Sequence, residues 1–292
     1  MTNLDQLLDQ LMTKDSNTII TVPTVTLHPF PDHPFKVQDN EEMAELTESI
    51  KELGILTPLV VRPLEGGQYE VISGHRRLFA CRKAGIDSVP AIVHNIDRDK
   101  AAITLVDSNL HREHILPSEK AHAYKLKLEA LNHQGKTSGQ VGQKWTRDNL
   151  ANDAPDSSRQ IHRYIRLTYL HPKILSMVDE GHIALTPAVE LSYLAQEEQS
   201  DLLETMGSED CTPSLSQAHQ MKLLSQAGQL NLDKIFAILS QPKANQQEKI
   251  SFKVSDLRRY FPKGYTTAQM TQDIIKGLEL LRMRRERDRD ER

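Results

Sequence analysis

The sequence lacks the features that mark secreted, membrane-spanning and metal-binding proteins. It has only two cysteines, Cys81 and Cys211, and they show no metal-ligand spacing. No apolar run approaches the roughly 20 residues of a membrane-spanning helix, and no secretory signal follows Met1. The twelve histidines form no HxxxH or HExxH pattern, so we expect no histidine metal site. A protein of the reducing cytoplasm, without a membrane partner, is the simplest expectation.

The net charge of the chain is also small. The formal net charge of −4 argues against indiscriminate coating of nucleic acid, but it leaves room for a local basic face. Charged residues make up 26% and hydrophobic residues 38% of the chain, which is ordinary for a globular protein. A length of 292 residues is enough for two or three domains.

The run at residues 69–80 carries the clearest sign of a ligand site. An apolar, β-prone half is followed by a helical half, so it predicts a strand, a tight turn and a helix. The apolar face of that helix and its end are predicted at Leu78, Cys81, Ala84 and Gly85. At the turn stand Gly74, His75, Arg76 and Arg77. Glycine allows close backbone approach, a helix N-terminus offers unpaired N–H groups, and arginine suits phosphate oxygens. The run therefore predicts a polyphosphate site, although two surface arginines after a turn would look the same in isolation.

Five segments are predicted along the chain. Residues 1–18 are expected to be a flexible tail with a short amphipathic helix (Leu4, Leu7, Leu8, Leu11) that docks on a partner or folds back. Residues 19–117 predict an α+β domain with extended segments at 19–27, 59–62, 69–72 and 89–93, the second and third forming a hairpin around 65–68. Its helices are expected after Asn40, which caps a stripe of Met43, Leu46, Ile50 and Leu53 before Gly54, and after Asp97. Residues 107–117 are expected to be a polar domain junction.

The second half predicts helices. Residues 118–227 are expected to be an all-α domain, opening with a long helix capped by Ser118 and containing helices near 140–145 and at 157–170. In the latter, Ile161, Ile165 and either Leu167 or Tyr169 are expected to face inward. Residues 228–248 are predicted to be a linker. Residues 249–292 predict a strand at 249–254 and a helix striped by Met270, Ile274, Leu278 and Leu281, which would dimerise because neither element can bury both faces alone.

The helix at 157–170 has a basic face. Arg159 and Arg163 lie four positions apart, and no acidic residue occurs between Asp156 and Asp179. Ser157 and Ser158 can cap the helix and donate to phosphate. This pattern is typical of a helix that enters the major groove, and also of an ordinary solvated basic face.

Taken in order, these segments resemble the ParB family of chromosome and plasmid partition proteins. TPLVVR (57–62), ISGHRRLFA (72–80) and VPAIV (89–93) are similar to boxes of the ParB N-terminal domain, which has a sulfiredoxin-like fold. SNLHRE (108–113) with LPSE (116–119) resembles the second signature block, and residues 157–167 resemble the DNA-reading helix of a helix-turn-helix domain. The resemblance covers roughly residues 22–203.

The resemblance implies a cytidine triphosphate pocket with Mg²⁺, in which residues 57–59 line the base, residues 74–77 and Arg112 hold phosphates, and Asn109 helps to hold the metal. The nucleotide-binding set it implies is Thr57, Pro58, Leu59, Ser73, Gly74, His75, Arg76, Arg77, Ser108, Asn109, His111 and Arg112. The implied DNA-binding set is Ser157, Ser158, Arg159, His162, Arg163 and Arg166. The implied partners are a palindromic site on double-stranded DNA, a second copy of the chain and a ParA-type ATPase, in a bacterial cytoplasm at the nucleoid or a plasmid.

Two departures bear on chemistry. The family usually has Glu where this chain has His75, and Glu where it has Ser108. Without the second carboxylate, CTP hydrolysis could be slow, differently assisted or absent, and the catalytic residue is unknown. Glu113 is the nearest carboxylate in that block. Residues 1–13 contain no Lys or Arg, whereas family tails that stimulate a partner ATPase are typically basic.

Two other functions are compatible with parts of the sequence. One is a ParB-like transcriptional regulator of a mobile element that binds DNA without nucleotide control. The other is a nucleotide-dependent phosphotransferase of the sulfiredoxin-like fold, which would need a reactive cysteine beside residues 74–76. Cys81 lies further along the predicted helix on its apolar face, so we expect it to be a packing residue.

Overall fold

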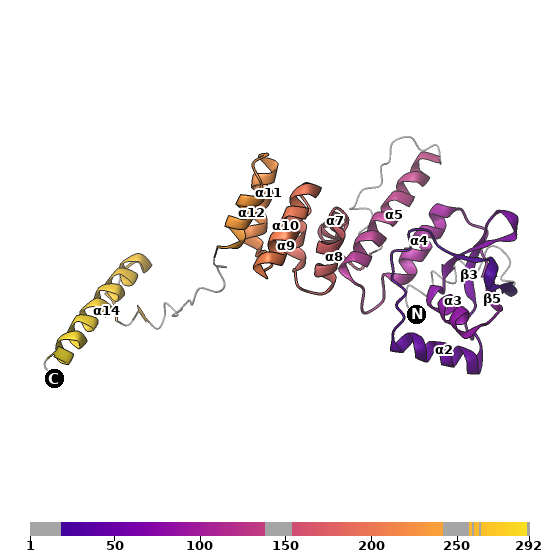
Figure 1. Cartoon of the computed structure of the whole chain (residues 1–292), viewed down its shortest axis with the longest axis horizontal. Helices are drawn as coiled ribbons and strands as arrows, with labels where there is room; N and C mark the ends of the chain where they lie inside the picture. The colour runs from indigo at the N-terminus through magenta and orange to yellow at the C-terminus, as the bar shows by residue number, and fades with distance from the viewer. Residues whose placement is uncertain (1–18, 138–153, 242–256, 259, 263, 291–292) are drawn as a thin grey trace. The chain divides into compact units, whose positions relative to one another are not determined.

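The computed structural model of the chain describes residues 19–137, 154–241, 257–258, 260–262 and 264–290 (Figure 1). It divides into two compact units, residues 1–241 and residues 242–292, and each is described by itself. The amphipathic helix expected in 1–18, the short helix near 140–145 and the strand at 249–254 lie outside the described residues.

A five-stranded mixed sheet forms the first layer, in the order β1-β5-β3-β4-β2. Its strands are β1 (Ile19–Pro23), β2 (Leu27–Pro29), β3 (Leu59–Pro63), β4 (Tyr69–Ser73) and β5 (Ser88–Val93), with 3-10 turns η1 (Thr24–Thr26) and η2 (Glu65–Gly67). The predicted hairpin is confirmed, because β3 and β4 pair antiparallel on either side of η2. β5 pairs parallel to β3 and antiparallel to β1, so β1 forms one edge of the sheet.

Helices α2 (Glu41–Leu53) and α3 (His75–Ala84) pack together on this sheet. Asn40 caps α2 as predicted, its side-chain oxygen accepting from the Met43 amide at 3.1 Å. Met43 and Ile50 are buried, but Leu53 is 64% exposed, so its predicted inward position is wrong. Leu53 is the last residue of α2, and the chain leaves the helix at Gly54, whose φ is 71°. Cys81 on α3 is fully buried, which confirms its packing position.

Helices α4 (Arg98–Asn109) and α5 (Pro117–Thr137) form the next layer. Asp97 caps α4, accepting from the Lys100 amide at 2.7 Å. The polar junction expected from residue 107 starts later, because residues 107–109 complete the last turn of α4. Ser118 is not the cap of α5: the helix already begins at Pro117, and the Ser118 hydroxyl donates to Asp179 instead.

Within the described residues 154–241 the chain forms six short helices: α7 (Ser158–Leu167), α8 (Pro172–Asp179), α9 (Leu185–Leu191), α10 (Gln196–Glu209), α11 (Leu215–Gln226) and α12 (Leu232–Leu239). Ser157 caps α7, and Leu167 is buried whereas Tyr169 is 51% exposed, so Leu167 is the inward residue. The helix ends at Leu167 rather than near 170, because the next amides turn back to carbonyls three positions earlier. The segment predicted to be a linker, 228–248, contains α12, whose Ile235, Ile238 and Leu239 are buried in the helical core.

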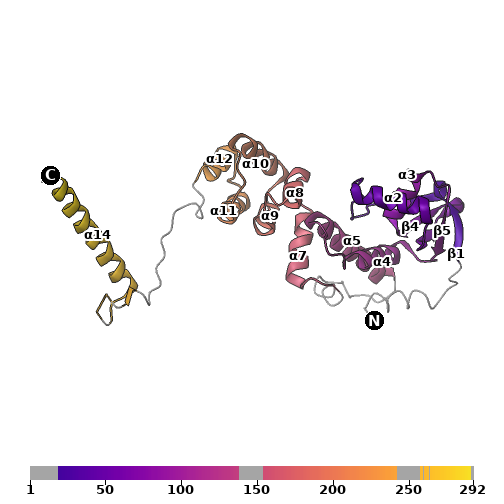
Figure 2. The same cartoon turned by 90° about the horizontal axis from the view of Figure 1, so that it is seen from below.

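Helix α7 joins two hydrophobic cores. Its Ile161 and Ile165 pack with Leu105 of α4 and Tyr124 of α5, whereas Leu167 packs with the cluster formed by α8 to α12. A movement of α4 or α5 would therefore reach α7 through direct side-chain contact. Figure 2 shows α4, α5 and α7 as neighbours in that order.

The described part of the second unit consists mainly of α14 (Thr267–Asp290). Met270 is buried, but Leu278 and Leu281 on the predicted stripe are 60% and 52% exposed. Dimerisation through this helix stays a prediction. Over the described ranges, none of the helices combines the length and apolarity needed to cross a membrane.

Candidate functional site

A cavity of about 240 Å³ lies where three segments that are distant in sequence come together. The first segment is the end of β4 with the start of α3, contributing Ser73, Gly74, His75, Arg76 and Arg77. The second is the end of α4 and the turn after it, contributing Ser108, Asn109 and Arg112. The third is the loop after β2 with one residue of α2, contributing His33, Phe35, Lys36, Val37 and Leu46. The two polar runs singled out in the sequence therefore face one cavity.

Gly74 makes the tight turn between β4 and α3. Its φ of 105° lies in the region that favours glycine, and no side chain caps the N-terminus of α3. A Cβ at this position would lie 3.0 Å from Leu59 Cγ and 3.2 Å from Arg77 Nη2. The N-terminus of α3, which no side chain caps, therefore lies at the wall of the cavity, where an anion could bind.

The three arginines of the cavity differ in what they contact. Arg77 donates to the carbonyl oxygen of Thr57 and, at 2.8 Å, to that of Pro58, so its guanidinium fixes the chain before β3. Arg76 reaches the exposed Glu42 at 3.0 Å. Arg112 stacks over the Phe35 ring at 5.6 Å, and partial burial followed by repulsion from Arg76 lowers its pKa. Arg76 and Arg112 are thus like charges held together, which favours an anion between them.

Four residues of the predicted set do not line the cavity. Thr57 and Pro58 contact Arg77 through their carbonyl oxygens, and Leu59 is fully buried behind Gly74. His111 is exposed at the turn after α4. The base-contacting role of residues 57–59 stays a prediction, because the structure places them beside the cavity rather than in its wall.

Ser108 and Asn109 end α4 at the wall of the cavity. The Ser108 hydroxyl donates to the Leu105 carbonyl at 3.0 Å, and the buried Asn109 uses Nδ2 to donate to the same carbonyl at 2.7 Å. Asn109 Nδ2 also donates to the Ser108 hydroxyl at 3.2 Å, so the amide oxygen of Asn109 is the atom suited to a cation. Over the described residues, no group of three or more His, Cys, Asp or Glu side chains could hold a metal by itself.

The prediction from sequence did not include the loop at 30–37 in the site. His75 Nε2 accepts from the Phe30 amide at 3.2 Å, and the His75 ring lies 3.8 Å from that of His33. His33 Nδ1 donates to the Phe35 carbonyl at 2.6 Å. Burial, followed by repulsion from His33 and Arg112, lowers the pKa of His75 to about 3. The cluster of His33, Phe35 and Lys36 among closely spaced prolines was the only sequence signal for this loop.

We expect His75 to make stability pH-dependent. The folded imidazole stays neutral down to about pH 3, whereas in the unfolded chain it takes up a proton below about pH 6.5. The free energy of unfolding should therefore fall as the pH falls from 6.5 toward 3, and wild type should lose about 1–2 kcal/mol between roughly pH 7 and 5 that His75→Gln does not lose. Urea unfolding at both pH values measures the difference. Burial also lowers the pKa of His33 and His94, but both residues remain in the variant, so equal pH slopes would contradict the assignment.

Among the arginines of the proposed DNA-binding set, Arg159 differs from Arg163 and Arg166 in having no polar partner among the described residues. Arg159 is exposed and has no hydrogen bond or ion pair within the described ranges. Arg163 donates to Thr186 on α9 and to Gln160. Arg166 donates to the Ser192 hydroxyl at 3.0 Å and lies 4.0 Å from the Tyr193 ring centroid, so it joins α7 to the end of α9. Ser157 caps the helix, while Ser158 and His162 are partly buried on it.

The chain is similar to known proteins over its N-terminal part. A model of the ParB N-terminal domain matches residues 9–110. The chromosome-partitioning protein Spo0J of Thermus thermophilus is 34% identical over 193 residues, which is 66% of this chain and 66% of that protein. The chain thus matches just under two thirds of that relative's length.

Two solved structures of C-terminally truncated ParB from Caulobacter crescentus are also similar. The one complexed to the centromeric parS site is 22% identical, with a TM-score of 0.42 over 75% of this chain and 98% of that chain. The one complexed with CTP-gamma-S is 25% identical, with a TM-score of 0.31 over 63% of this chain and 96% of that chain.

Proposed function

The chain belongs to the ParB-type partition proteins through its N-terminal domain, and from this premise we propose that it binds DNA under the control of CTP. It would bind a palindromic site as a homodimer through α7 and its neighbours. CTP would switch the N-terminal domains between an open and a self-engaged form, so that the dimer acts as a clamp in the segregation of a chromosome, plasmid or mobile element. This requires CTP to bind the closed form more tightly than the open form.

The observation that carries the proposal is the meeting of two arginine-bearing segments at one cavity. Arg76 on α3 and Arg112 after α4 are 36 positions apart in sequence, yet both line it. The free amides of α3 and the two guanidinium groups suit the several oxygens of a triphosphate. Among the described lining residues there is no carboxylate that would repel it.

The residues present also fit Mg²⁺ bound together with a nucleotide. Mg²⁺ prefers oxygen ligands and usually shares them with substrate phosphates. Asn109 offers an amide oxygen, and Ser108 and Ser73 offer hydroxyl groups at the cavity wall. The ion would neutralise part of the triphosphate charge. Since Glu113 is exposed and does not line the cavity, we propose a binding switch without fast hydrolysis.

A packed route connects the cavity with the proposed DNA-binding helix. Arg112 follows α4 directly, and α4 shares a hydrophobic core with α5 and α7 through Leu105, Tyr124 and Ile161. Tyr124 is fully buried, and its hydroxyl donates to Asp156 at 2.6 Å, just before α7. A nucleotide that moves the end of α4 would therefore displace the start of α7.

The function is tested by nucleotide selectivity. Calorimetric titration with CTP, ATP, GTP and UTP should show binding of CTP in preference to the others, and Arg76→Ala should weaken it. Equal affinity for all four nucleotides would exclude the proposed switch. Footprinting on DNA with and without CTP separates the clamp from the regulator: an unchanged footprint and no sliding would favour a ParB-like regulator without nucleotide control.

Arg159→Ala should weaken DNA binding across all sequences. Its exposed side chain suits a phosphate contact, so we expect a loss of about tenfold in affinity and a decrease of about one in the slope of log affinity against log salt. Arg166→Ala is the matched variant: it breaks contacts to Ser192 and Tyr193, so it should lower thermal stability instead. Fluorescence anisotropy over a salt series measures both. An unchanged salt slope for Arg159→Ala would place DNA on another face.

A further inference from the structure

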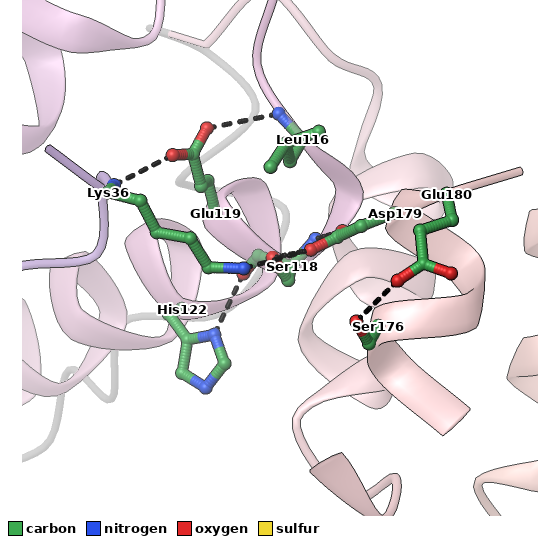
Figure 3. A network of polar contacts seen from close by, with 8 residues as sticks. All are labelled: Lys36, Leu116, Ser118, Glu119, His122, Ser176, Asp179 and Glu180. Carbon is green, nitrogen blue, oxygen red and sulfur yellow. Dashed lines mark hydrogen bonds and ion pairs between the residues drawn. The ribbon is translucent and has the colours of Figure 1, made fainter. Parts of the chain in front are cut away.

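Lys36 belongs to two sites at once. It lines the cavity, and its ammonium group lies 3.3 Å from Asp179 Oδ2 at the end of α8 (Figure 3). Its own amide donates to Glu119 Oε1 at 2.8 Å, and Glu119 Oε2 accepts from the Leu116 amide at 3.1 Å. The loop that borders the cavity is therefore fixed to the start of α5 by its backbone and to α8 by its side chain.

Asp179 has partners other than Lys36. Its Oδ1 accepts from the Ser118 amide at 2.9 Å and its Oδ2 from the Ser118 hydroxyl at 2.5 Å. Only 8% of the Asp179 side chain is exposed, whereas 57% of the Lys36 side chain is. Departure of the ammonium would therefore leave the carboxylate still paired at the N-terminus of α5, where a negative charge is favourable. Because the ammonium side of this ion pair is exposed to solvent, we expect the lysine to be weakly held and easily exchanged.

A polyphosphate in the cavity would compete for the same ammonium group. Its oxygens carry more negative charge than one carboxylate, and lysine is a flexible point charge that can turn from one anion to the other. We propose that Lys36 pairs with Asp179 when the cavity is empty and with the phosphates when it is filled, so that nucleotide binding releases the loop from α8. This deepens the proposed function and rests on it, since it names the residue pair through which the site regulates the helical part.

If Asp179 and the phosphates compete for Lys36, substitutions of Asp179 and of Lys36 should change CTP affinity in opposite directions. Asp179→Asn keeps oxygen and nitrogen positions that can pair with Ser118, but it removes the charge that holds Lys36. It should therefore tighten CTP binding by about two- to fivefold, while Lys36→Met should weaken it by about tenfold. In the Lys36→Met background, Asp179→Asn should change nothing. Lys51→Met is the control, because Lys51 pairs with Glu48 at 2.7 Å and does not line the cavity.

Calorimetry with CTP and Mg²⁺ on the full chain, with melting curves to verify folding, measures all four variants. Amide hydrogen exchange at residues 176–181 gives a second readout: CTP should accelerate it in wild type and not in Lys36→Met. The inference is overturned if Asp179→Asn acts equally with and without Lys36, or if Lys36→Met leaves CTP affinity and the exchange response intact. If wild type binds no CTP, the proposed function fails as well; if it binds CTP without this coupling, only the inference fails.

Discussion

Arg112→Ala should lower the affinity for CTP by roughly 10- to 100-fold, the loss expected for charge-assisted hydrogen bonds to phosphate. The same substitution should leave the melting temperature of the nucleotide-free protein nearly unchanged. Arg112 is an exposed residue whose partly buried guanidinium contacts the Phe35 ring and is repelled by Arg76, so these effects on stability oppose each other. A large effect on binding with a small effect on stability identifies a residue kept for a ligand.

The experiment compares CTP titrations and melting curves of wild type, Arg112→Ala and Arg98→Ala. Arg98 is an exposed arginine that lies 3.9 Å from Asp32 and does not line the cavity. It controls for the general loss of a positive charge near the site. CTP should raise the melting temperature of wild type and Arg98→Ala, because a ligand that binds only the folded state stabilises it. Unaltered CTP affinity in Arg112→Ala would remove this residue from the site.

Gly74→Ala should destabilise the fold and abolish nucleotide binding together. A side chain at a φ of 105° is strained by about 1–2 kcal/mol. Its Cβ would lie 3.0 Å from Leu59 Cγ, and because Leu59 is fully buried, we expect this close contact to add roughly 1–3 kcal/mol. The sum corresponds to a fall in melting temperature of at least about 4 °C. Displacement of the turn would also redirect the first amides of α3, so CTP binding should be lost.

Gly85→Ala is the matched control for this prediction. Gly85 ends the same helix with a φ of 73°, but apart from its neighbours along the chain no described heavy atom lies within 4 Å of the position a Cβ would take. It should therefore cost about 1 kcal/mol of strain alone, and the folded protein should still bind CTP. Equal stabilities of the two variants would show that the contact with Leu59 is relieved and does not shape the turn.

Local features of the site were predictable. Asn40, Asp97 and Ser157 were recognisable as helix caps because a cap bonds to an amide only a few positions away. Gly74 was recognisable as a turn for the same local reason. The prediction that residues 73–77 meet residues 108–112 rested on the resemblance to the ParB family, because no local interaction places α4 beside β4.

Other features depended on contacts between distant residues. Leu53 follows the apolar stripe of α2, yet it is exposed because the helix ends there. Ser118 has the residue type of a cap, but the helix starts before it and its hydroxyl meets Asp179, 61 positions away. The polar run at 245–248 suggested a linker over 228–248, yet α12 within that segment packs Ile235 and Ile238 into the helical core.

By itself the sequence determined the strand–turn–helix around Gly74, the helix caps and the basic positions of α7, because spacing and hydrogen bonds to near neighbours act within a few residues. Only the tertiary structure decided how each charged side chain is used. Arg77 is bound to backbone carbonyls, Arg166 is held by Ser192 and Tyr193, and Lys36 reaches Asp179 across 143 positions. The reason is physical: an arginine or lysine has the same donors wherever it stands, and the fold alone decides which acceptors lie within their reach.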